Sequence, residues 1–285
     1  ATVLAKVERA DVDYVSVKVS AIVANLDVLA FDDSVCRVTD RLRTLYRAAG
    51  AATPTTFVNL DMEEFRDLDL TIDAFISVLG EPEFATVDAG IVLQAYLPDS
   101  HGAAERLGAW AAQRRSDGGG TVKVRLVKGA NLAMESVEAE LHGWIAAPYG
   151  NKADVDASYK RLLDSLLRPE WAEAIRIGVA SHNLFDIAWA MLQIDKAGAT
   201  GRVVFEMLEG MAPAQARAIQ AAAAEAGLGK LLMYSPVVAE ADFDASLAYL
   251  SRRLDENTQA DNFLRSLFTL TIDSAEFDRQ ADMFS

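Results

Sequence analysis

Short apolar runs alternate along the chain with longer amphipathic stretches. Segments such as VCRVTDRLRTLYRAA and AERLGAWAAQRR repeat apolar residues at the three- and four-residue spacing of a helix. Seven runs rich in aliphatic and β-branched residues predict strands. They cover residues 14–20, 56–62, 90–97, 122–129, 175–183, 203–210 and 230–237. Strands that alternate with helices predict parallel βαβ units, and strands that are apolar at nearly every position are typical of sheets covered on both faces.

An open doubly wound sheet and a closed (βα)8 barrel both contain such units. No predicted strand is followed by a G-x-G-x-x-G turn, which weakens the dinucleotide-binding open sheet. Polar residues favour the barrel, because in six of the seven strands they fall late in the strand or just past it, where barrel enzymes build their sites. These residues are Lys18, Asp61, Gln94, Arg125, Lys128, His182, Asn183 and Glu206.

Seven strands are one fewer than a closed barrel of this kind contains. Residue 1 leads directly into a helix-like stretch, TVLAKVERA, and then into the first predicted strand. We therefore expect one barrel domain over residues 1–285 that begins after its first strand and carries a terminal helix over the barrel mouth. An exposed strand edge is an aggregation liability, so we expect a strand from elsewhere to fill the gap.

Composition narrows the functional classes. The chain has 285 residues, half of them hydrophobic, and a formal net charge of −15, which argues against nucleic-acid binding. Cys36 is the only cysteine and no Cys/His cluster has zinc spacing, so we expect no internal disulfide, no metal and a reducing, cytoplasmic location. No basic region precedes an apolar run at the start, and no apolar run reaches the ~18–20 residues that span a bilayer. Peripheral contact with the inner face of a membrane stays open.

The segment KVRLVKGAN, residues 123–131, is the most informative piece of the chain. Arg125 and Lys128 are three residues apart, so in a strand they point to opposite faces unless one lies past its end. Gly129 then allows a tight turn. Two cations at a barrel mouth suit a phosphate or a reduced flavin, and an ion pair with Asp61 or Glu206 is an equally good interpretation.

Other strand ends carry weaker signals. The run Ser181-His182-Asn183 ends a strand with three hydrogen-bonding side chains, which favours cofactor contact over proton transfer. Lys18 is costly among inward-facing residues unless it is paired, and Asp61 is a ready partner, although Lys18 extending to the rim is the alternative. Two further residues are ambiguous between a site wall and ordinary core, namely Leu208 and Tyr234.

Two adjacent arginines stand in the segment AYLSRRLDEN, residues 248–257, of this acidic chain. On a helix, Tyr249, Arg252 and Arg253 share a face. A solvated helix with neighbouring acids is one interpretation. If this helix covers the barrel mouth, the two guanidinium groups form a clamp for a carboxylate, which arginine matches in a bidentate manner.

In their order along the chain, these segments resemble those of the flavin-dependent proline dehydrogenase domain of the proline utilisation A type. The resemblance rests on VSVKVSAI, VNLDMEEF, VLQAYL, VRLVKGA, SHN, LEGM, YSPV and YLSRRLDEN and covers most of the chain. RLVKGA and YLSRRLDEN are the most specific of these. The resemblance implies a (βα)8 barrel that holds FAD non-covalently and oxidises L-proline to Δ1-pyrroline-5-carboxylate, with the electrons passed to a membrane quinone or another acceptor.

The resemblance also implies roles for individual residues. Lys18, Arg252 and Arg253 would bind the proline carboxylate. Asp61 would orient Lys18, while Asn131, Leu208 and Tyr234 would wall the ring. Lys18 and Arg125 would be the catalytic residues, with Arg125 near the reactive edge of the flavin. The remaining flavin contacts would come from Gln94, Val127, Gly129, Lys152, Ser181, His182, Asn183 and Glu206.

Three departures from the family stand out. Asn131 and Leu132 replace an aromatic pair, Ser181 replaces a threonine, and the segment around the first barrel strand has no match. In related proteins the domain is fused to an aldehyde dehydrogenase, and nothing here resembles that half, so the chain is expected to be a segment of a longer protein. Two alternatives remain: a Schiff-base aldolase barrel that uses Lys128 as its amine nucleophile, and a barrel that serves as a non-catalytic binding module.

Overall fold

The computed structural model describes residues 2–229, 231–235, 243, 244, 247, 251, 254, 262–266 and 269–285. The chain divides into two compact units, Ala1–Gly178 and Val179–Ser285. The predicted carboxylate clamp, Arg252 and Arg253, lies outside the described residues. That residues 1–285 form one barrel domain stays a prediction.

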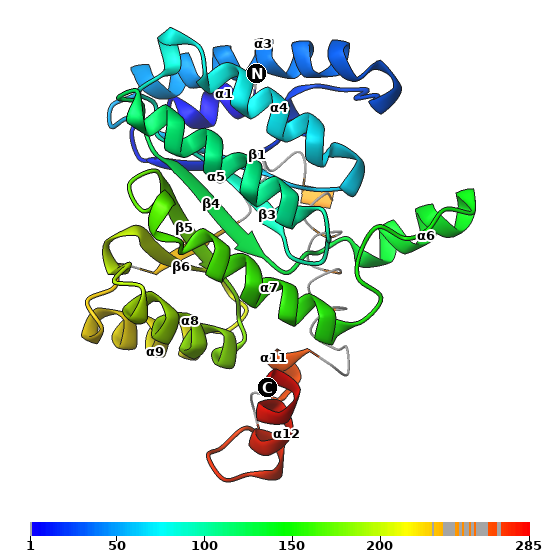
Figure 1. Ribbon diagram of the computed structural model, residues 1–285, viewed down its shortest axis with the longest axis vertical. Helices are drawn as coiled ribbons and strands as arrows, with labels where there is room; N and C mark the ends of the chain where they lie inside the picture. The colour runs from blue at the N-terminus through cyan, green and yellow to red at the C-terminus, as the bar shows by residue number, and fades with distance from the viewer. Residues whose placement is uncertain are drawn as a thin grey trace. The chain divides into compact units, whose positions relative to one another are not determined.

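The first unit is built from parallel βα units (Figure 1). Its strands are β1 (Tyr14–Lys18), β2 (Phe57–Asp61), β3 (Ala89–Gln94) and β4 (Val122–Val127), and β5 (Ile175–Ala180) crosses its boundary. Its α-helices are α1 (Thr2–Val7), α2 (Val19–Ile22), α3 (Phe31–Ala51), α4 (Leu68–Leu79), α5 (Ser100–Ser116), α6 (Leu132–His142) and α7 (Lys152–Leu166). Its 3₁₀ helices are η1 (Val28–Ala30), η2 (Phe65–Asp67), η3 (Pro82–Phe84) and η4 (Pro169–Trp171).

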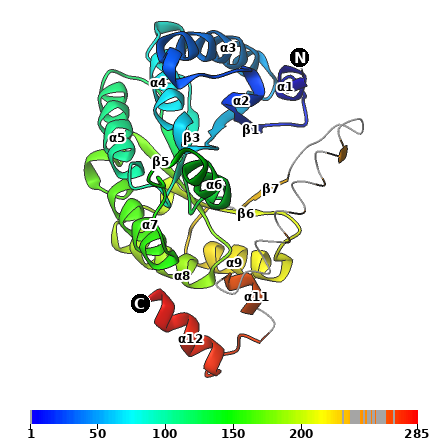
Figure 2. The same ribbon diagram turned by 90° about the vertical axis from the view of Figure 1, so that its right-hand side faces the viewer.

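The second unit continues the same alternation. Its strands are β6 (Val203–Leu208) and β7 (Leu232–Tyr234), which pair in parallel. Its helices are α8 (Leu184–Lys196), η5 (Thr200–Arg202), α9 (Pro213–Glu225), α11 (Phe263–Ser266) and α12 (Ala275–Phe284), which Figure 2 shows from a second side.

The strands neighbour one another in chain order, β1-β2-β3-β4-β5-β6-β7. All seven predicted strands are confirmed, each shorter than its apolar run, and the chain has an α/β fold with a parallel sheet. A closed eight-stranded barrel, completed by a strand from elsewhere, stays a prediction. No helix within the described stretches is long and apolar enough to cross a membrane.

Close packing of the helices buries the central strands of the first unit, β3 and β4. Every residue of β3 is buried, as its continuous apolar run predicts. Helices α3, α4, α5 and α7 lie side by side in chain order, whereas α6 projects away from them (Figure 1). Helix α5 approaches η4 so closely that a Cβ atom on Gly108 would lie 2.3 Å from the Trp171 ring. A side chain at position 108 would therefore force the helix away from the core.

A buried arginine ties together the turns that lead into β3 and β4. The Arg114 guanidinium on α5 donates hydrogen bonds to four carbonyl oxygens, at distances from 2.6 to 3.2 Å. The acceptors are Leu79, Phe84, Val87 and Gly120. Since buried carbonyl groups need partners, this one side chain satisfies the last carbonyls of α4 and η3 together with two loop carbonyls.

Replacing this arginine should destabilise the fold strongly. In Arg114→Met the aliphatic volume is kept but four carbonyl groups lose their donor, so we expect a loss of about 3 kcal/mol or more in the free energy of unfolding. Urea denaturation followed by circular dichroism measures it. Arg115→Met is the matched control, because Arg115 is exposed and makes one bond to a carbonyl, that of Gly119. Equal stability of the two variants would contradict this role.

Candidate active site

Arg125 is held at the carboxyl-terminal half of β4 by groups from β1 and β2. Its guanidinium, 7% exposed, donates to Asp61 Oδ1 at 2.6 Å, Ser16 Oγ at 3.2 Å and Tyr14 Oη at 3.2 Å. The ion pair with Asp61 is the alternative that the sequence left open for this arginine. This ion pair fixes a permanent positive charge beside the last residue of β2, near the carboxyl end of β4.

Lys18 pairs with a different carboxylate from the one expected. Its Nζ lies 2.6 Å from Glu63 Oε1, whereas Asp61 binds Arg125. Lys18 and Asp61 are register partners at the ends of β1 and β2, but Asp61 also accepts the Ser16 hydroxyl at 2.6 Å. The carboxylate is therefore already engaged deeper in the strands, and the half-exposed lysine turns to the loop that follows β2. The prediction that Asp61 orients Lys18 is corrected to Glu63.

Glu63 also joins this loop to β3 and β4 through its main chain. Its carbonyl oxygen accepts Asn131 Nδ2 at 2.7 Å and Gln94 Nε2 at 3.3 Å. Asn131 thus ties the β2 loop to the end of β4. Sequence reasoning missed Glu63, although an acid two residues past a strand-end aspartate is a usable signal. Further along, burial raises the pKa of Asp67 to about 6.

The turn after β4 fits tightly against an aromatic ring. Gly129 has a φ of +131°, and a Cβ atom there would lie 2.5 Å from the Tyr96 ring, so this position requires glycine. The Tyr96 main-chain N–H donates to the Lys128 carbonyl at 2.8 Å. The hydroxyl of Tyr96 lies 3.4 Å from Glu135 Oε1, which also accepts the Phe65 N–H. Tyr96 was not predicted as part of the site.

Lys128 lies one residue past the end of β4, so the alternation of the strand does not set its direction, and it pairs with a different carboxylate from that of Arg125. Its Nζ lies 2.6 Å from Oδ1 of Asp156, a buried residue of α7, and Lys152 binds the other oxygen of the same carboxylate. Burial alone would raise the pKa of Asp156, but the two ammonium groups outweigh it and lower that pKa. Together, Lys128, Lys152 and Asp156 carry one net positive charge.

In the second unit, the Ser181-His182-Asn183 segment forms a turn between β5 and α8. The Leu208 N–H donates to His182 Nε2 at 3.2 Å, so this ring nitrogen acts as a hydrogen-bond acceptor. Ser181 Oγ donates to Asp186 Oδ2 at 2.7 Å and accepts the Asn183 N–H at 3.0 Å. These contacts favour a positioning and hydrogen-bonding role over proton transfer.

Three further predicted site residues lie in strands. Val127 closes β4, and its carbonyl accepts the Ala95 N–H at 2.8 Å. Glu206 is almost fully buried in β6. Tyr234 closes β7 opposite Leu208, and its carbonyl accepts the Glu209 N–H at 2.8 Å.

The chemistry of the first unit fits a flavin. Gln94 Oε1 is buried at the end of β3 and accepts no hydrogen bond from the described residues, so it can receive an N–H of a bound ring. The tight Gly129 turn leaves main-chain groups accessible, and Arg125 supplies a cation. No group of three or more His, Cys, Asp or Glu in the described part of the chain is arranged to hold a metal.

Comparisons with known proteins identify the family of this chain. A sequence model of the family described as "Proline dehydrogenase" matches residues 2–266. The chain is 27% identical over 267 residues to the "Bifunctional protein PutA" of Salmonella typhimurium, covering 90% of this chain and 19% of that protein. It is 35% identical over 107 residues to the "Proline dehydrogenase" of Deinococcus radiodurans, covering 38% of this chain and 27% of that protein.

Solved structures show the same likeness. The structure of proline utilization A from Corynebacterium freiburgense is 44% identical, with a TM-score of 0.86, over 99% of this chain and 27% of that one. That of proline utilization A from Bdellovibrio bacteriovorus, inactivated by N-propargylglycine, is 36% identical, with a TM-score of 0.81, over 95% of this chain and 26% of that one. The chain thus spans about a quarter or less of the proline utilisation A relatives named here. It belongs to the proline dehydrogenase family.

Proposed function

We propose that this chain is a proline dehydrogenase domain that oxidises L-proline to Δ1-pyrroline-5-carboxylate with FAD as its cofactor. The observation that carries the proposal is the family match over residues 2–266. The strand-end geometry supports it, because a buried amide oxygen, a glycine turn and a fixed guanidinium suit a flavin better than a phosphate alone. A hydride acceptor is the chemistry that FAD supplies when bound.

The residues of the first unit hold and tune the cofactor in this proposal. Arg125, fixed by Asp61, stabilises negative charge near the reactive edge of the ring. Gln94 accepts from the ring, and the main chain at Val127 and Gly129 lies against it. Lys152 binds toward the adenosine half. In the second unit, Ser181, His182, Asn183 and Glu206 are proposed to contribute the remaining contacts.

Substrate binding needs orientation more than acid–base chemistry, since transfer from the ring carbon beside nitrogen depends on alignment. Lys18, positioned by Glu63 at 2.6 Å, and the two arginines at 252 and 253 bind the carboxylate. Leu208 and Tyr234 line the pocket around the proline ring. Asn131 contacts the proline ring through its amide, where the family resemblance implies an aromatic residue.

The proposal extends to electron transfer and to partners. Electrons pass from the reduced flavin to a membrane quinone or another acceptor, which requires peripheral contact with a membrane if the acceptor is lipid-bound. The relatives carry the name "Bifunctional" and are several times longer than this chain. An aldehyde dehydrogenase domain that oxidises the product is therefore the partner that we propose, fused or associated.

The aldolase alternative is disfavoured by the placement of Lys128. A Schiff-base lysine must lose its proton to act as a nucleophile. Here Nζ lies 2.6 Å from a buried carboxylate, an arrangement that stabilises the ammonium form.

Flavin content tests the proposed function against both alternatives. We expect the purified protein to be yellow and to contain about one FAD per chain, released by mild denaturation because it is bound non-covalently. A colourless protein that traps a carbonyl compound after borohydride treatment would support the aldolase. A colourless protein that traps nothing would support the binding module.

Loss of the Arg125 side chain should affect flavin binding and reduction more than proline affinity. In Arg125→Ala the cation near the ring is lost, so we expect weaker flavin retention or slower flavin reduction, with proline affinity less affected. Stopped-flow absorbance measures the reduction rate, and the melting temperature of the flavin-free protein reports the separate effect of losing the Asp61 ion pair. Unchanged flavin content and reduction rate would remove Arg125 from the site.

Arg252 and Arg253 should each contribute to binding the carboxylate of proline. A charge-assisted hydrogen bond contributes ~1.5–3 kcal/mol, so Arg252→Met or Arg253→Met should each weaken proline binding about tenfold or more. Flavin content should change little. Titration with a carboxylate analogue of proline and with the same ring lacking the carboxylate separates the two effects, because only the first ligand should weaken. Arg265→Met is the control, since Arg265 is an exposed arginine of α11. Normal proline binding by either variant would contradict the clamp.

A further inference from the structure

The turn that carries Ser181, His182 and Asn183 is fixed by the first turn of α8. Asn183 is the N-cap of that helix, and its Oδ1 accepts the Phe185 N–H at 2.9 Å. Asp186, 1% exposed, binds Ser181 Oγ at 2.7 Å. Any change in the position of this helix end therefore moves Ser181 and Asn183, which flank His182.

Phe185 connects this helix end to the carboxyl-terminal helices. Its ring centroid lies 6.2 Å from that of Phe263 on α11, 5.3 Å from that of Phe277 and 5.9 Å from that of Phe284, both on α12. Helix α12 packs against α8 through these rings. Because aromatic pairs at such distances stabilise one another beyond simple burial, the cluster restrains the direction of α8.

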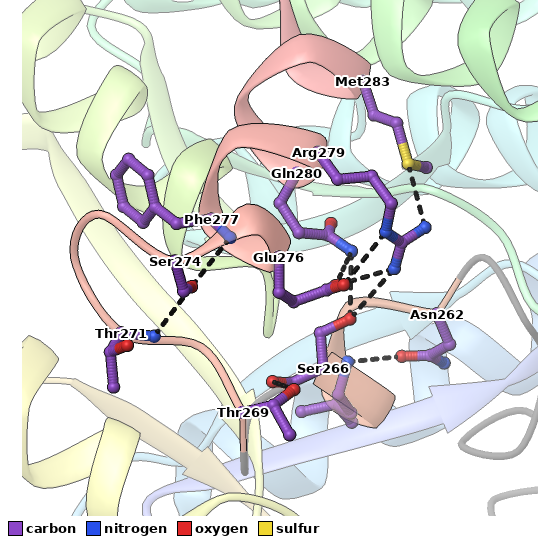
Figure 3. Close-up of polar contacts among 11 residues, drawn as sticks. Asn262, Ser266, Thr269, Thr271, Ser274, Glu276, Phe277, Arg279, Gln280 and Met283 are labelled. Atoms are coloured by element: carbon purple, nitrogen blue, oxygen red, sulfur yellow. Dashed lines mark hydrogen bonds and ion pairs between the residues drawn. The ribbon is translucent and has the colours of Figure 1, made fainter.

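Helices α11 and α12 are held together by their own polar network (Figure 3). Ser266 Oγ accepts Gln280 Nε2 at 3.0 Å and Arg279 NH2 at 3.4 Å. Glu276 Oε1 accepts the same two side chains at 3.0 and 2.6 Å. Hydrogen bonds from Arg279, Ser266 and Gln280 lower the pKa of Glu276 to about 2, so the network keeps its charge over the whole physiological range.

A side-chain cap defines where α12 begins. Ser274 is its N-cap, and the Phe277 N–H donates to Ser274 Oγ at 3.1 Å, as Figure 3 shows. This bond sets the helical turn from which the Phe277 ring reaches Phe185. The polar network and the cap thus fix the helix whose aromatic face restrains α8.

The match to the proline dehydrogenase family ends at Ser266, so α12 lies beyond the matched stretch. We propose that α12 is a clasp which, through Phe277 and Phe284 against Phe185, positions the Ser181-His182-Asn183 turn for the cofactor. Phe185 is a positioning residue in this scheme and touches no reacting group. The inference rests on the proposed flavin function, because the turn is a flavin contact only in that proposal.

The test compares flavin affinity with the stability of the flavin-free protein. In the double variant Phe277→Ala/Phe284→Ala, two ring contacts to Phe185 are lost, so the dissociation constant for FAD, measured by quenching of flavin fluorescence, should rise about tenfold. The melting temperature of the flavin-free protein should fall much less than in a core variant. With FAD at saturation, the KM for proline should be unchanged.

The conservative variants and the control separate positioning from general destabilisation. Phe277→Leu and Phe284→Leu keep apolar contact with Phe185, so each should retain most of the affinity. Ile272→Ala should have no effect, because Ile272 precedes α12 and is 80% exposed. If the double variant does not fold, single alanine variants are titrated, each with an expected rise of about threefold.

Each outcome decides between the two proposals. If the unmodified protein binds no flavin, the proposed function fails. If the unmodified protein binds flavin and the alanine variants bind it equally well, the clasp is wrong while the function stands. An equal loss in Ile272→Ala, or a rise in the KM for proline at saturating FAD, would also overturn the clasp.

Discussion

Parallel pairing in register is the constraint on which the candidate site depends. Because β1 pairs with β2 so that Lys18 lies opposite Asp61, and β3 pairs with β4 so that Gln94 lies opposite Val127, the last residues of these strands end at the same edge. The core covers the apolar side chains of these strands, and several of the polar residues lie at or near the carboxyl ends, namely Lys18, Asp61, Gln94 and Arg125. The candidate site residues of the first unit thus gather at one edge of its strands.

Electrostatics then decides which polar groups are fixed. In a chain with a formal net charge of −15, each cation at this edge has a carboxylate partner within 2.6 Å: Arg125 has Asp61, Lys18 has Glu63 and Lys128 has Asp156. In the Arg125–Asp61 and Lys128–Asp156 pairs, one of the two side chains is buried. The geometry of these two pairs is therefore better defined than that of an exposed surface pair. The positive charges are therefore oriented before any ligand arrives, which reduces the cost of binding an anionic group.

The sequence predicted the elements better than the contacts. Seven apolar runs identified seven strands, because a buried parallel strand leaves a signal in consecutive residues. Strand-end polar residues such as Gln94 and Arg125 followed from the same logic. The partner of Lys18 did not, since choosing between Asp61 and Glu63 depends on whether Arg125 reaches Asp61 first, which is a matter of three-dimensional distance. The same limit applies to Arg114 and Phe185, whose partners are scattered along the chain and leave no local pattern.

We propose that this chain transfers reducing equivalents from proline to a bound flavin. The most direct measurement is an anaerobic titration of the purified, flavin-loaded protein with L-proline, followed by the visible absorption of the flavin, with D-proline as the stereochemical control. The account predicts that L-proline bleaches the oxidised flavin and that Δ1-pyrroline-5-carboxylate appears in equal amount, while D-proline leaves the spectrum unchanged. A flavin that stays oxidised in excess L-proline, although sodium dithionite reduces it, would contradict the account.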